Sequence, residues 1–286
     1  MSKPQWLKKK IISGALYKNI QTTLKKYELH TVCEKAHCPN RWECYSKEIS
    51  TFLILGDKCT RTCRFCAIEH NPPSPPDTEE PIHIAEAIRH LNLKYVVITS
   101  VTRDDLPDGG ANHFASIIME IRRKTPDTRI EVLIPDFNGS NDALSFVVCA
   151  CPDVIGHNVE TVPRLYSTVR PGADYHRSIQ LLKRIHELDR SITIKSGLML
   201  GMGETPDEIR QVLTDLLEVN CAIVTLGQYL QPSKELLPVK KYIPPYEFEQ
   251  WKEIALKMGF QTVASGPFVR SSYNANEYFN SIKEKS

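Results

Sequence analysis

The stretch "TFLILGDKCTRTCRFC", residues 51–66, decides the fold because it joins an apolar strand to a loop rich in cysteine. Its first residues form a short continuous apolar run, which is typical of a strand buried on both faces in a parallel sheet. The loop then carries Cys59, Cys63 and Cys66, with three and two residues between them. Polar loops at the carboxyl ends of parallel strands build the active sites of α/β enzymes. We therefore expect this strand to open a parallel sheet and its loop to carry chemistry.

The alternation that begins with this strand continues to about residue 260. Apolar strand candidates are followed by amphipathic helix candidates, and the connections between them are polar. The strands are predicted at 51–56, 95–101, 130–134, 154–159, 193–200 and 222–230, and the helices at about 82–92, 111–124, 141–150, 175–189, 206–219 and 245–258. Six successive βα units predict an α/β protein with a partial (β/α)6 TIM-like barrel, and a doubly wound open sheet is the alternative.

The ends of the chain do not follow this repeat and are expected to pack on the barrel. The predicted division is an N-terminal extension at 1–50, a barrel at 51–260 and a C-terminal extension at 261–286. One helix has a clear start, because Thr205 precedes Pro206 and Glu208 completes a capping box. The segment "NPPSPPDTEEP", residues 71–81, is too rich in proline for a helix or a central strand.

Composition excludes several classes of partner. The 286 residues are 41% hydrophobic and carry a net charge of +2, so the charge demands neither nucleic acid nor an anionic membrane. Apolar runs are far shorter than the ~20 residues of a membrane span. The N-terminus lacks a secretion signal, which predicts a cytoplasmic protein. The run Lys8-Lys9-Lys10 is most simply solvated, although it could attract an acidic carrier domain.

The cysteines point to metal binding. There are nine, an odd number, and six of them lie between residues 33 and 66. Disulfides are not expected in a reducing compartment, and clustering of this kind indicates ligation rather than packing. The isolated Cys149, Cys151 and Cys221 are expected to be buried and to act as small hydrophobes.

Cys59, Cys63 and Cys66 can hold three irons of a 4Fe–4S cube and leave the fourth iron open to a chelating small molecule. A zinc knuckle with His70 is the alternative, and a plain ferredoxin is less favoured because its cysteine run is absent. Arg61 would raise the local positive potential, as would Arg64.

This spacing, with Phe65 before the last cysteine, resembles the radical S-adenosylmethionine (SAM) superfamily. The resemblance implies that the amino and carboxylate groups of SAM bind the open iron. It also implies that an electron from the cluster cleaves the sulfonium.

A second trio of cysteines indicates which family within the superfamily the chain resembles. Cys33, Cys38 and Cys44 stand upstream with four and five residues between them, and this pattern is similar to that of lipoyl synthases. Other matching segments include "VVITSVTRDDLPDGGA", "HNVETV", "KSGLMLGMGET", "GQYLQPS" and "GPFVRSSY", in the order of that family, over residues 3–279. Leu53 and Ile194 depart from the expected methionine and threonine, and neither touches an expected ligand.

The resemblance implies insertion of two sulfur atoms at carbons 6 and 8 of an octanoyl chain. That chain hangs from a lysine of a lipoyl carrier domain, such as the glycine cleavage H protein or a 2-oxoacid dehydrogenase E2 domain. Two SAM molecules are consumed, an electron donor such as flavodoxin or ferredoxin is needed, and the second 4Fe–4S cluster supplies the sulfur. The cofactors carry the chemistry, so no catalytic side chain is expected. Asp104 and Asp105 are adjacent in the sequence, and they are expected to anchor their loop rather than to act in catalysis.

The resemblance also implies the remaining ligands. Ser272 of "RSSY" is the expected fourth ligand of the cluster held by the first trio, and its hard oxygen suits a soft cluster poorly. Residues expected to contact SAM are Phe65, Asn158, Glu160 and Arg170. The alternatives are another radical SAM sulfur-inserting enzyme, of the biotin synthase or methylthiotransferase type, and a two-cluster electron-transfer protein.

Overall fold

The computed structural model describes residues 3–8, 14–46 and 50–283. Lys9 and Lys10 of the basic run lie outside these ranges. The chain divides into two compact units. The N-terminal unit comprises Lys10–Arg61 and Ala67–Ile155, and the C-terminal unit comprises Met1–Lys9, Thr62–Cys66 and Gly156–Ser286.

The N-terminal unit is built on a short run of paired strands. Strand β1 (His30–Thr31) pairs antiparallel with β2 (Thr51–Ile54), and β2, β3 (Tyr95–Ser100) and β4 (Arg129–Leu133) pair in parallel. In this register Ile98 stands beside Phe52 on one side and Val132 on the other, and all three are fully buried. The apolar run at residues 51–54 is therefore an inner strand, as its composition predicts.

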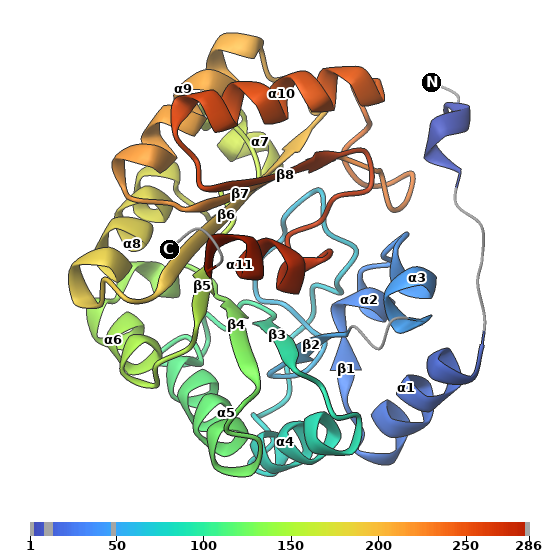
Figure 1. The fold of residues 1–286 in the computed structure, drawn as a ribbon, viewed down its shortest axis with the longest axis vertical. Coiled ribbons are helices and arrows are strands. Elements are labelled where there is room, and N and C mark those ends of the chain that lie inside the picture. Colours follow the sequence, from blue (N-terminus) through green and yellow to red (C-terminus); the bar gives the residue numbers. More distant parts are fainter. Residues whose placement is uncertain (1–2, 9–13, 47–49, 284–286) are drawn as a thin grey trace. The chain divides into compact units, whose positions relative to one another are not determined.

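Helices cover this sheet and the segment before it. In Figure 1 the helices α4 (Glu80–His90), α5 (Ala111–Lys124) and α6 (Asn141–Cys149) follow one another along the outer side of β2–β4. The N-terminal segment adds α1 (Ala15–Lys26), α2 (Val32–Lys35) and α3 (Arg41–Ser46). Tyr17 of α1 stacks on Trp42 of α3 with ring centroids 4.8 Å apart, which fixes these two helices against each other. A short 3₁₀ turn, η2 (Phe137–Gly139), follows β4.

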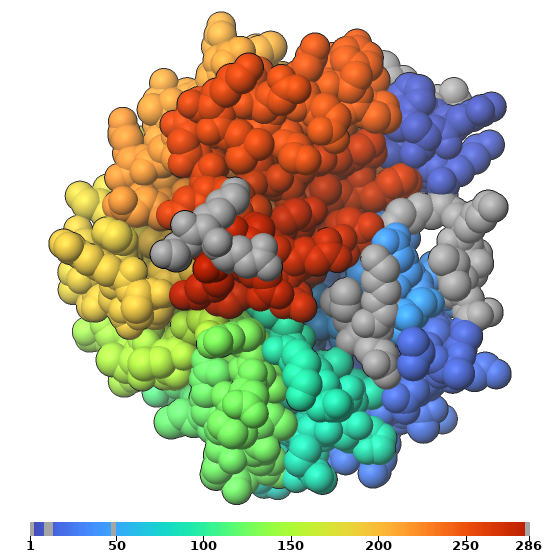
Figure 2. Space-filling model, in the orientation of Figure 1, coloured from blue at the N-terminus to red at the C-terminus, as the bar shows by residue number. Residues whose placement is uncertain are grey.

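The C-terminal unit contains the parallel strands β6 (Thr193–Leu200), β7 (Ile223–Gln228) and β8 (Thr262–Gly266). Its larger helices α8 (Tyr175–Leu188), α9 (Pro206–Glu218) and α10 (Pro245–Met258) form a continuous outer layer in the space-filling view (Figure 2). The smaller elements are η1 (Gln5–Leu7), η3 (Pro163–Leu165), α7 (Tyr166–Val169) and α11 (Ala275–Lys283). Helix α11 packs on β8, where Ser281 and Thr262 exchange a hydrogen bond of 2.9 Å.

The predicted α/β alternation is confirmed. The strands follow chain order in the sheet from β1 to β8, with β5 (Val154–Gly156) where the chain passes between the units. Each of the six predicted strands and six predicted helices corresponds to an observed element. The capping box at the start of α9 is present, with Glu208 N–H donating to Thr205 Oγ1 at 3.3 Å and Thr205 N–H donating to Glu208 Oε2 at 2.8 Å.

Two elements differ from the prediction. The segment after residue 260 begins with β8, which pairs in parallel with β7 and so adds another βα unit to the repeat. Strand β5 ends at Gly156 rather than at 159, and farther along the chain Glu160 has φ of 64°. No helix among residues 3–8, 14–46 and 50–283 is both long and apolar enough to cross a membrane.

Candidate functional site

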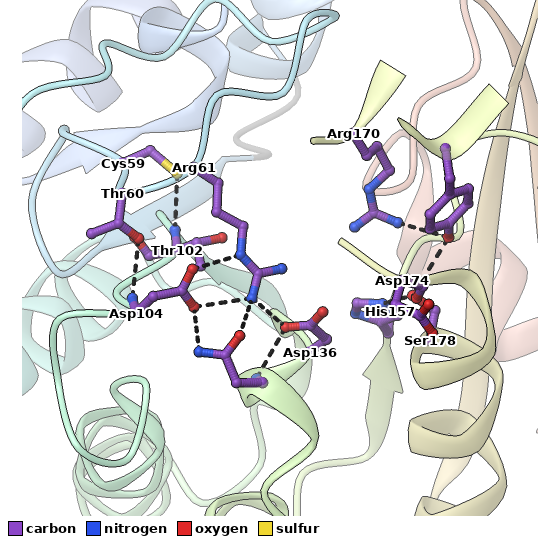
Figure 3. A network of polar contacts seen from close by, with 12 residues as sticks. Cys59, Thr60, Arg61, Thr102, Asp104, Asp136, His157, Arg170, Asp174 and Ser178 are labelled. Carbon is purple, nitrogen blue, oxygen red and sulfur yellow. Dashed lines mark hydrogen bonds and ion pairs between the residues drawn. The ribbon is translucent and has the colours of Figure 1, made fainter. Parts of the chain in front are cut away.

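In the N-terminal unit, the first part of the cysteine loop is held by a buried ion cluster. Arg61, only 7% exposed, forks onto Asp104 with contacts of 2.7 and 3.0 Å (Figure 3). Its Nη2 also donates to Asp136 at 2.6 Å and to Asn138 at 2.8 Å. Burial alone lowers the pKa of Arg61, but Asp136 and Asp104 more than reverse this and raise it. The guanidinium is therefore permanently charged and fully neutralised by its neighbours.

The backbone on either side of Cys59 is fixed as well. Thr60 donates to the Thr102 carbonyl both from its N–H, at 3.1 Å, and from its hydroxyl, at 3.0 Å. The N–H of Thr102 donates to Cys59 Sγ at 3.4 Å, as Figure 3 shows. Backbone N–H donors to cysteine sulfur are among the features that set the potential of iron–sulfur clusters. The Cys59 sulfur therefore sits in surroundings suited to a cluster thiolate.

The first trio also lies in the N-terminal unit. Cys33 and Cys44 are buried and Cys38 is half-buried. Burial, and then the neighbouring Cys38 and Cys44, raise the pKa of the Cys33 thiol to about 12 against a backbone hydrogen bond at Thr51. Cys38 and Cys44 are thus close enough to Cys33 to oppose its ionisation. A cationic metal group relieves this repulsion and takes up the thiolates, so the donor set fits an iron–sulfur cluster.

The second part of the cysteine loop is anchored in the C-terminal unit. The N–H of Arg64 donates to the Val169 carbonyl at 2.9 Å, and the Arg64 carbonyl accepts from Leu237 N–H at 2.9 Å. Phe65 packs against a buried group made of Val169, Met202, Tyr229 and Leu237. The short segment between Cys63 and Cys66 is therefore held on both sides, and Phe65 contributes apolar surface at this position.

A single-ion site gains no support. Within the ranges that the structure describes, no three His, Cys, Asp or Glu side chains are arranged to hold one metal ion. His70, the fourth ligand of the zinc alternative, is exposed. In a 4Fe–4S cube each thiolate binds its own iron, so its ligands do not converge on one point. Ligation by Cys59, Cys63 and Cys66 stays a prediction.

The predicted SAM contacts come together beyond β5. Asn158 Nδ2 donates to Glu160 Oε1 at 3.0 Å. Arg170 Nη1 donates to the carbonyls of Asn158 and Val159, at 3.0 and 3.2 Å, and to the Tyr166 hydroxyl at 3.0 Å. The Tyr166 hydroxyl also donates to Ser178 Oγ of α8 at 3.4 Å, and Figure 3 labels Arg170 and Ser178 of this network. Asn158, Glu160 and Arg170, which are near one another in the sequence, thus form one polar group.

The polar group of Asn158, Glu160 and Arg170 contains a donor that a ligand could still use. Arg170 is 9% exposed, yet its Nε has no hydrogen-bond partner among the described residues. Burial disfavours its charge, but Tyr166, Glu160 and Cys63 raise the pKa of Arg170, which places it within electrostatic reach of the cysteine loop. Burial raises the pKa of Glu160 against the opposing effect of Arg170. A charged donor and a carboxylate acceptor fit the carboxylate and ribose hydroxyls of SAM.

The "RSSY" segment follows β8 in the same unit. Ser271 Oγ donates to Asn158 Oδ1 at 3.0 Å, so this segment contacts the polar group just described. Ser272 is half-buried in the turn closed by Tyr273 N–H and the Arg270 carbonyl, at 2.9 Å. Ser272 and the first trio belong to different units, so ligation by Ser272 stays a prediction.

Several sequence expectations need correction or addition. Cys221 is buried as predicted, but Cys149 and Cys151 are exposed, because α6 ends at Cys149 and the chain turns at the surface with Cys151 at φ of 56°. Arg61 does not supply free positive potential, because two carboxylates neutralise it. The prediction that Asp104 anchors its loop is confirmed. Sequence reasoning missed Ser271, whose partner lies 113 residues away.

Comparison with protein families matches both parts of the chain. Residues 53–216 match the radical SAM superfamily, and residues 1–38 match the N-terminal domain of lipoyl synthase of the radical SAM family. Lipoyl synthase from Caldanaerobacter subterraneus subsp. tengcongensis is 54% identical over 274 residues, which cover 96% of each chain. Lipoyl synthase from Caldicellulosiruptor saccharolyticus is 54% identical over 275 residues, with the same coverage of both chains.

Solved structures share the fold. The FeFe-hydrogenase maturase HydG from Carboxydothermus hydrogenoformans superposes with a TM-score of 0.60 at 15% identity, covering 93% of this chain and 68% of that one. Streptococcus suis SuiB bound to its precursor peptide SuiA gives a TM-score of 0.60 at 11% identity, covering 87% and 52%. At these identities the likeness concerns the fold alone, and it agrees with the partial barrel predicted from the strand pattern.

Proposed function

Because the chain belongs to the lipoyl synthase family of the radical SAM superfamily, we propose that its two cysteine trios hold clusters with different tasks. The protein is a radical SAM enzyme of lipoyl cofactor synthesis, and it uses 4Fe–4S clusters and SAM. Its substrate is an octanoylated carrier protein. In the proposed division, Cys59, Cys63 and Cys66 hold the cluster that binds SAM, and the first trio holds an auxiliary cluster that provides sulfur.

The chemistry requires cofactors rather than side chains. Methylene C–H bonds of an octanoyl chain offer no useful target to an acid, a base or a nucleophile. When bound, SAM and its cluster supply the one-electron chemistry that such bonds require. The task of the chain is to bind the cofactors, orient them and exclude water.

One observation carries the assignment of the SAM pocket. Arg170 is buried with an unpartnered Nε, and it lies near both Glu160 and the Cys63 thiol. We assign Arg170 to the SAM carboxylate and Glu160 and Asn158 to its ribose hydroxyls. Since Nη1 of Arg170 is already fixed by three acceptors, the guanidinium is held in place before a ligand arrives. Such preorganisation strengthens binding by reducing the entropy lost on ordering. Phe65 contributes its apolar surface to the same pocket.

Ser272 is assigned as the fourth ligand of the auxiliary cluster. A serine oxygen is a hard donor and is readily protonated, whereas the iron of a sulfide cluster prefers thiolate. Iron bound to Ser272 should therefore be released more easily than iron bound to Cys33, Cys38 or Cys44. Release of that iron would leave the adjacent sulfides accessible, which suits a cluster that gives up its sulfur to form two C–S bonds at carbons 6 and 8.

The identities of the carrier proteins, of the electron donor and of the cellular compartment are also proposed from the family of the chain. The carriers are the glycine cleavage H protein or 2-oxoacid dehydrogenase E2 domains, and the electron donor is a flavodoxin or a ferredoxin. Six of the nine cysteines are proposed cluster ligands. Thiolate ligands must stay reduced to bind iron, which supports a cytoplasmic location.

Anaerobic reconstitution with iron and sulfide tests the function. The protein is then given SAM, a reductant and an octanoyl-lysine peptide, and the nucleoside and peptide products are measured by mass spectrometry. The proposal expects 5′-deoxyadenosine together with a peptide that has gained two sulfur atoms. SAM cleavage without sulfur transfer would restrict the assignment to the radical SAM superfamily. Reduction of the clusters without SAM cleavage would instead support an electron-transfer protein.

A further inference from the structure

The cysteine loop leaves β2 through an unusual residue. Leu55, which is 1% exposed, has φ of 65°, and the next residue, Gly56, has φ of 87°. A leucine in the left-handed region is strained and persists only where its surroundings enforce it. Its backbone shows how: the N–H donates to Glu80 Oε2 at 3.0 Å, and the carbonyl accepts from Arg103 Nη1 at 3.1 Å.

Residues of neighbouring elements also hold Leu55 in this backbone conformation. Glu80 also contacts His113 Nε2 at 2.6 Å, so its carboxylate is fixed between α5 and the end of β2. Arg103, which is 2% exposed, is oriented by a fork onto Asp105 with both contacts at 2.9 Å. Gly110 gives the Leu55 side chain its room, because a Cβ at that position would lie 2.3 Å from Leu55 Cδ1.

Two adjacent residues, Arg103 and Asp104, form hydrogen bonds to the two ends of the segment Leu55–Arg61. Arg103 holds the carbonyl of Leu55, where the segment begins, and Asp104 holds the guanidinium of Arg61, where it ends. The Asp104 N–H also donates to Thr60 Oγ1 at 3.0 Å. Cys59 lies between these two points, with its sulfur accepting from Thr102 N–H. All of these contacts lie within the N-terminal unit.

We propose that Arg103 and Asp104 are positioning residues that set the Leu55–Arg61 segment, and with it the Cys59 sulfur, before iron is bound. Neither residue touches the reacting atoms; each acts through the chain that carries Cys59. The proposal rests on the proposed function only in taking Cys59 as an iron ligand. Fixing a ligand in advance removes the ordering entropy that metal binding would otherwise have to overcome.

Asp104→Asn is the variant that tests this. It keeps the size of the side chain but removes the charge that Arg61 pairs with, so the segment should open more often. The apo-protein is treated with iodoacetamide, and alkylation of each cysteine is followed by peptide mass spectrometry. Cys59 should react about fivefold faster than in the wild type, the change that loss of one ordinary interaction produces. The rate at Cys33, in the same unit, should stay unchanged.

Asp153→Asn is the matched control. Like Asp104, Asp153 is a carboxylate paired with arginine: it accepts from Arg122 at 2.7 Å, from Arg129 at 2.8 Å and from the Ile130 N–H at 2.8 Å. It is more buried than Asp104, with 10% against 30% of its side chain exposed. It directly precedes β5 and bonds to the first residues of β4, at the strand ends opposite to the cysteine loop. Its loss should lower the melting temperature at least as much, yet leave the Cys59 rate at the wild-type value.

Thr60→Val extends the test if Asp104→Asn does not fold. It removes the hydroxyl contacts with the Thr102 carbonyl and the Asp104 N–H while keeping every charge. It should accelerate Cys59 alkylation in the same direction. An unchanged Cys59 rate in the folded variants, or an equal increase in Asp153→Asn, would overturn the proposal.

Iron content separates this proposal from the proposed function. After reconstitution, Asp104→Asn should lose iron to a chelator about fivefold faster than Asp153→Asn, in line with the alkylation result. If Cys59→Ala retained all of the iron and the SAM-dependent electron paramagnetic resonance signal, the ligand assignment would fail. The effect of Asp104 on Cys59 in the apo-protein would be unaffected by that outcome.

Discussion

Arg61 and Arg170 are both buried arginines, but their hydrogen bonds give them different roles. Arg61 donates hydrogen bonds to Asp104, Asp136 and Asn138, and these contacts fix the loop that carries it. Arg170 is anchored by the hydrogen bonds of its Nη1, and its buried Nε has no partner among the described residues. A buried donor without an acceptor is costly, and a bound ligand would supply the acceptor that Arg170 Nε lacks. Composition could not separate the two arginines, because only the fold decides which acceptors surround each of them.

Arg170→Lys tests the proposed SAM contact at the scale of the residue. Lysine keeps a positive charge but cannot hold the three Nη1 acceptors and also present a planar second donor. We expect SAM affinity to fall by about tenfold or more, as for the loss of a charge-assisted hydrogen bond. Isothermal titration of SAM into the reconstituted protein measures this.

Arg164→Lys is the control for that substitution. Arg164 lies on the preceding 3₁₀ turn, is 55% exposed and pairs with Glu208 at the surface. Its replacement should leave SAM affinity within about twofold of the wild type, since exposed ion pairs contribute little. Equal losses in the two variants would show that Arg170 does not bind SAM.

Ser272→Cys tests the weak-ligand proposal. A thiolate at this position should hold its iron more firmly than an alkoxide, because soft sulfur suits the cluster better. Both clusters should therefore assemble, and SAM should still be cleaved, while sulfur insertion falls at least about tenfold. Peptide mass spectrometry and 5′-deoxyadenosine yield are measured on the same samples.

Ser271→Cys makes the same change one residue earlier. Ser271 donates to Asn158, so this variant should weaken SAM binding but leave the release of auxiliary iron unchanged. Wild-type sulfur insertion by Ser272→Cys would contradict the role given to Ser272.

Among the elements, the segment after β8 is placed by a close backbone contact with β7. A Cβ on Gly227 would lie 2.2 Å from the Val269 carbonyl oxygen, so only glycine allows the chain before "RSSY" to pass there. The same segment continues through Ser271, which bonds to Asn158. The end of β7 therefore sets where Ser271 and Ser272 lie in the C-terminal unit.

Gly227→Ala should displace this segment. A backbone oxygen cannot move aside as a flexible side chain can, so we expect a loss of about 1–3 kcal/mol in the free energy of unfolding. Gly266→Ala is the control, since its Cβ would meet Val269 Cγ2 at an ordinary 3.5 Å. Urea unfolding of the apo-proteins measures both. Equal stability of the two variants would show that the close contact at Gly227 is absent.

The regular elements were predictable because their signals are local. The apolar runs of β2, β3 and β4 and the capping box of α9 are each contained in a few adjacent residues. Strand β8, "TVASG", was missed because it is short and ends in serine and glycine, and its parallel pairing with β7 is a tertiary interaction. Cys149 and Cys151 were misjudged because exposure depends on what packs around the end of α6.

The contacts within the site were not predictable in the same way. Cysteine spacing and family resemblance located the loop, and the order of polar segments placed Asn158 and Glu160 after a strand. The hydrogen bond from Arg103 to the Leu55 carbonyl joins positions 48 residues apart, and the ion pair of Arg61 with Asp136 joins positions 75 residues apart. Such pairings follow from strand order and register rather than from any local pattern.

For the whole molecule, the proposed ligands are distributed between the two units. The N-terminal unit carries Cys33, Cys38, Cys44 and Cys59, and the C-terminal unit carries Cys63, Cys66 and Ser272. The polar group around Arg170 also belongs to the C-terminal unit.

The cluster held by the first trio is the proposed sulfur source, and isotope-labelled sulfur tests this proposal most directly. The clusters are rebuilt with heavy-isotope sulfide, free sulfide is removed, and one turnover with SAM and octanoyl-lysine peptide follows in the presence of unlabelled sulfide. Mass spectrometry of the peptide should show the heavy isotope at both new C–S bonds. A product containing only unlabelled sulfur would contradict the claim.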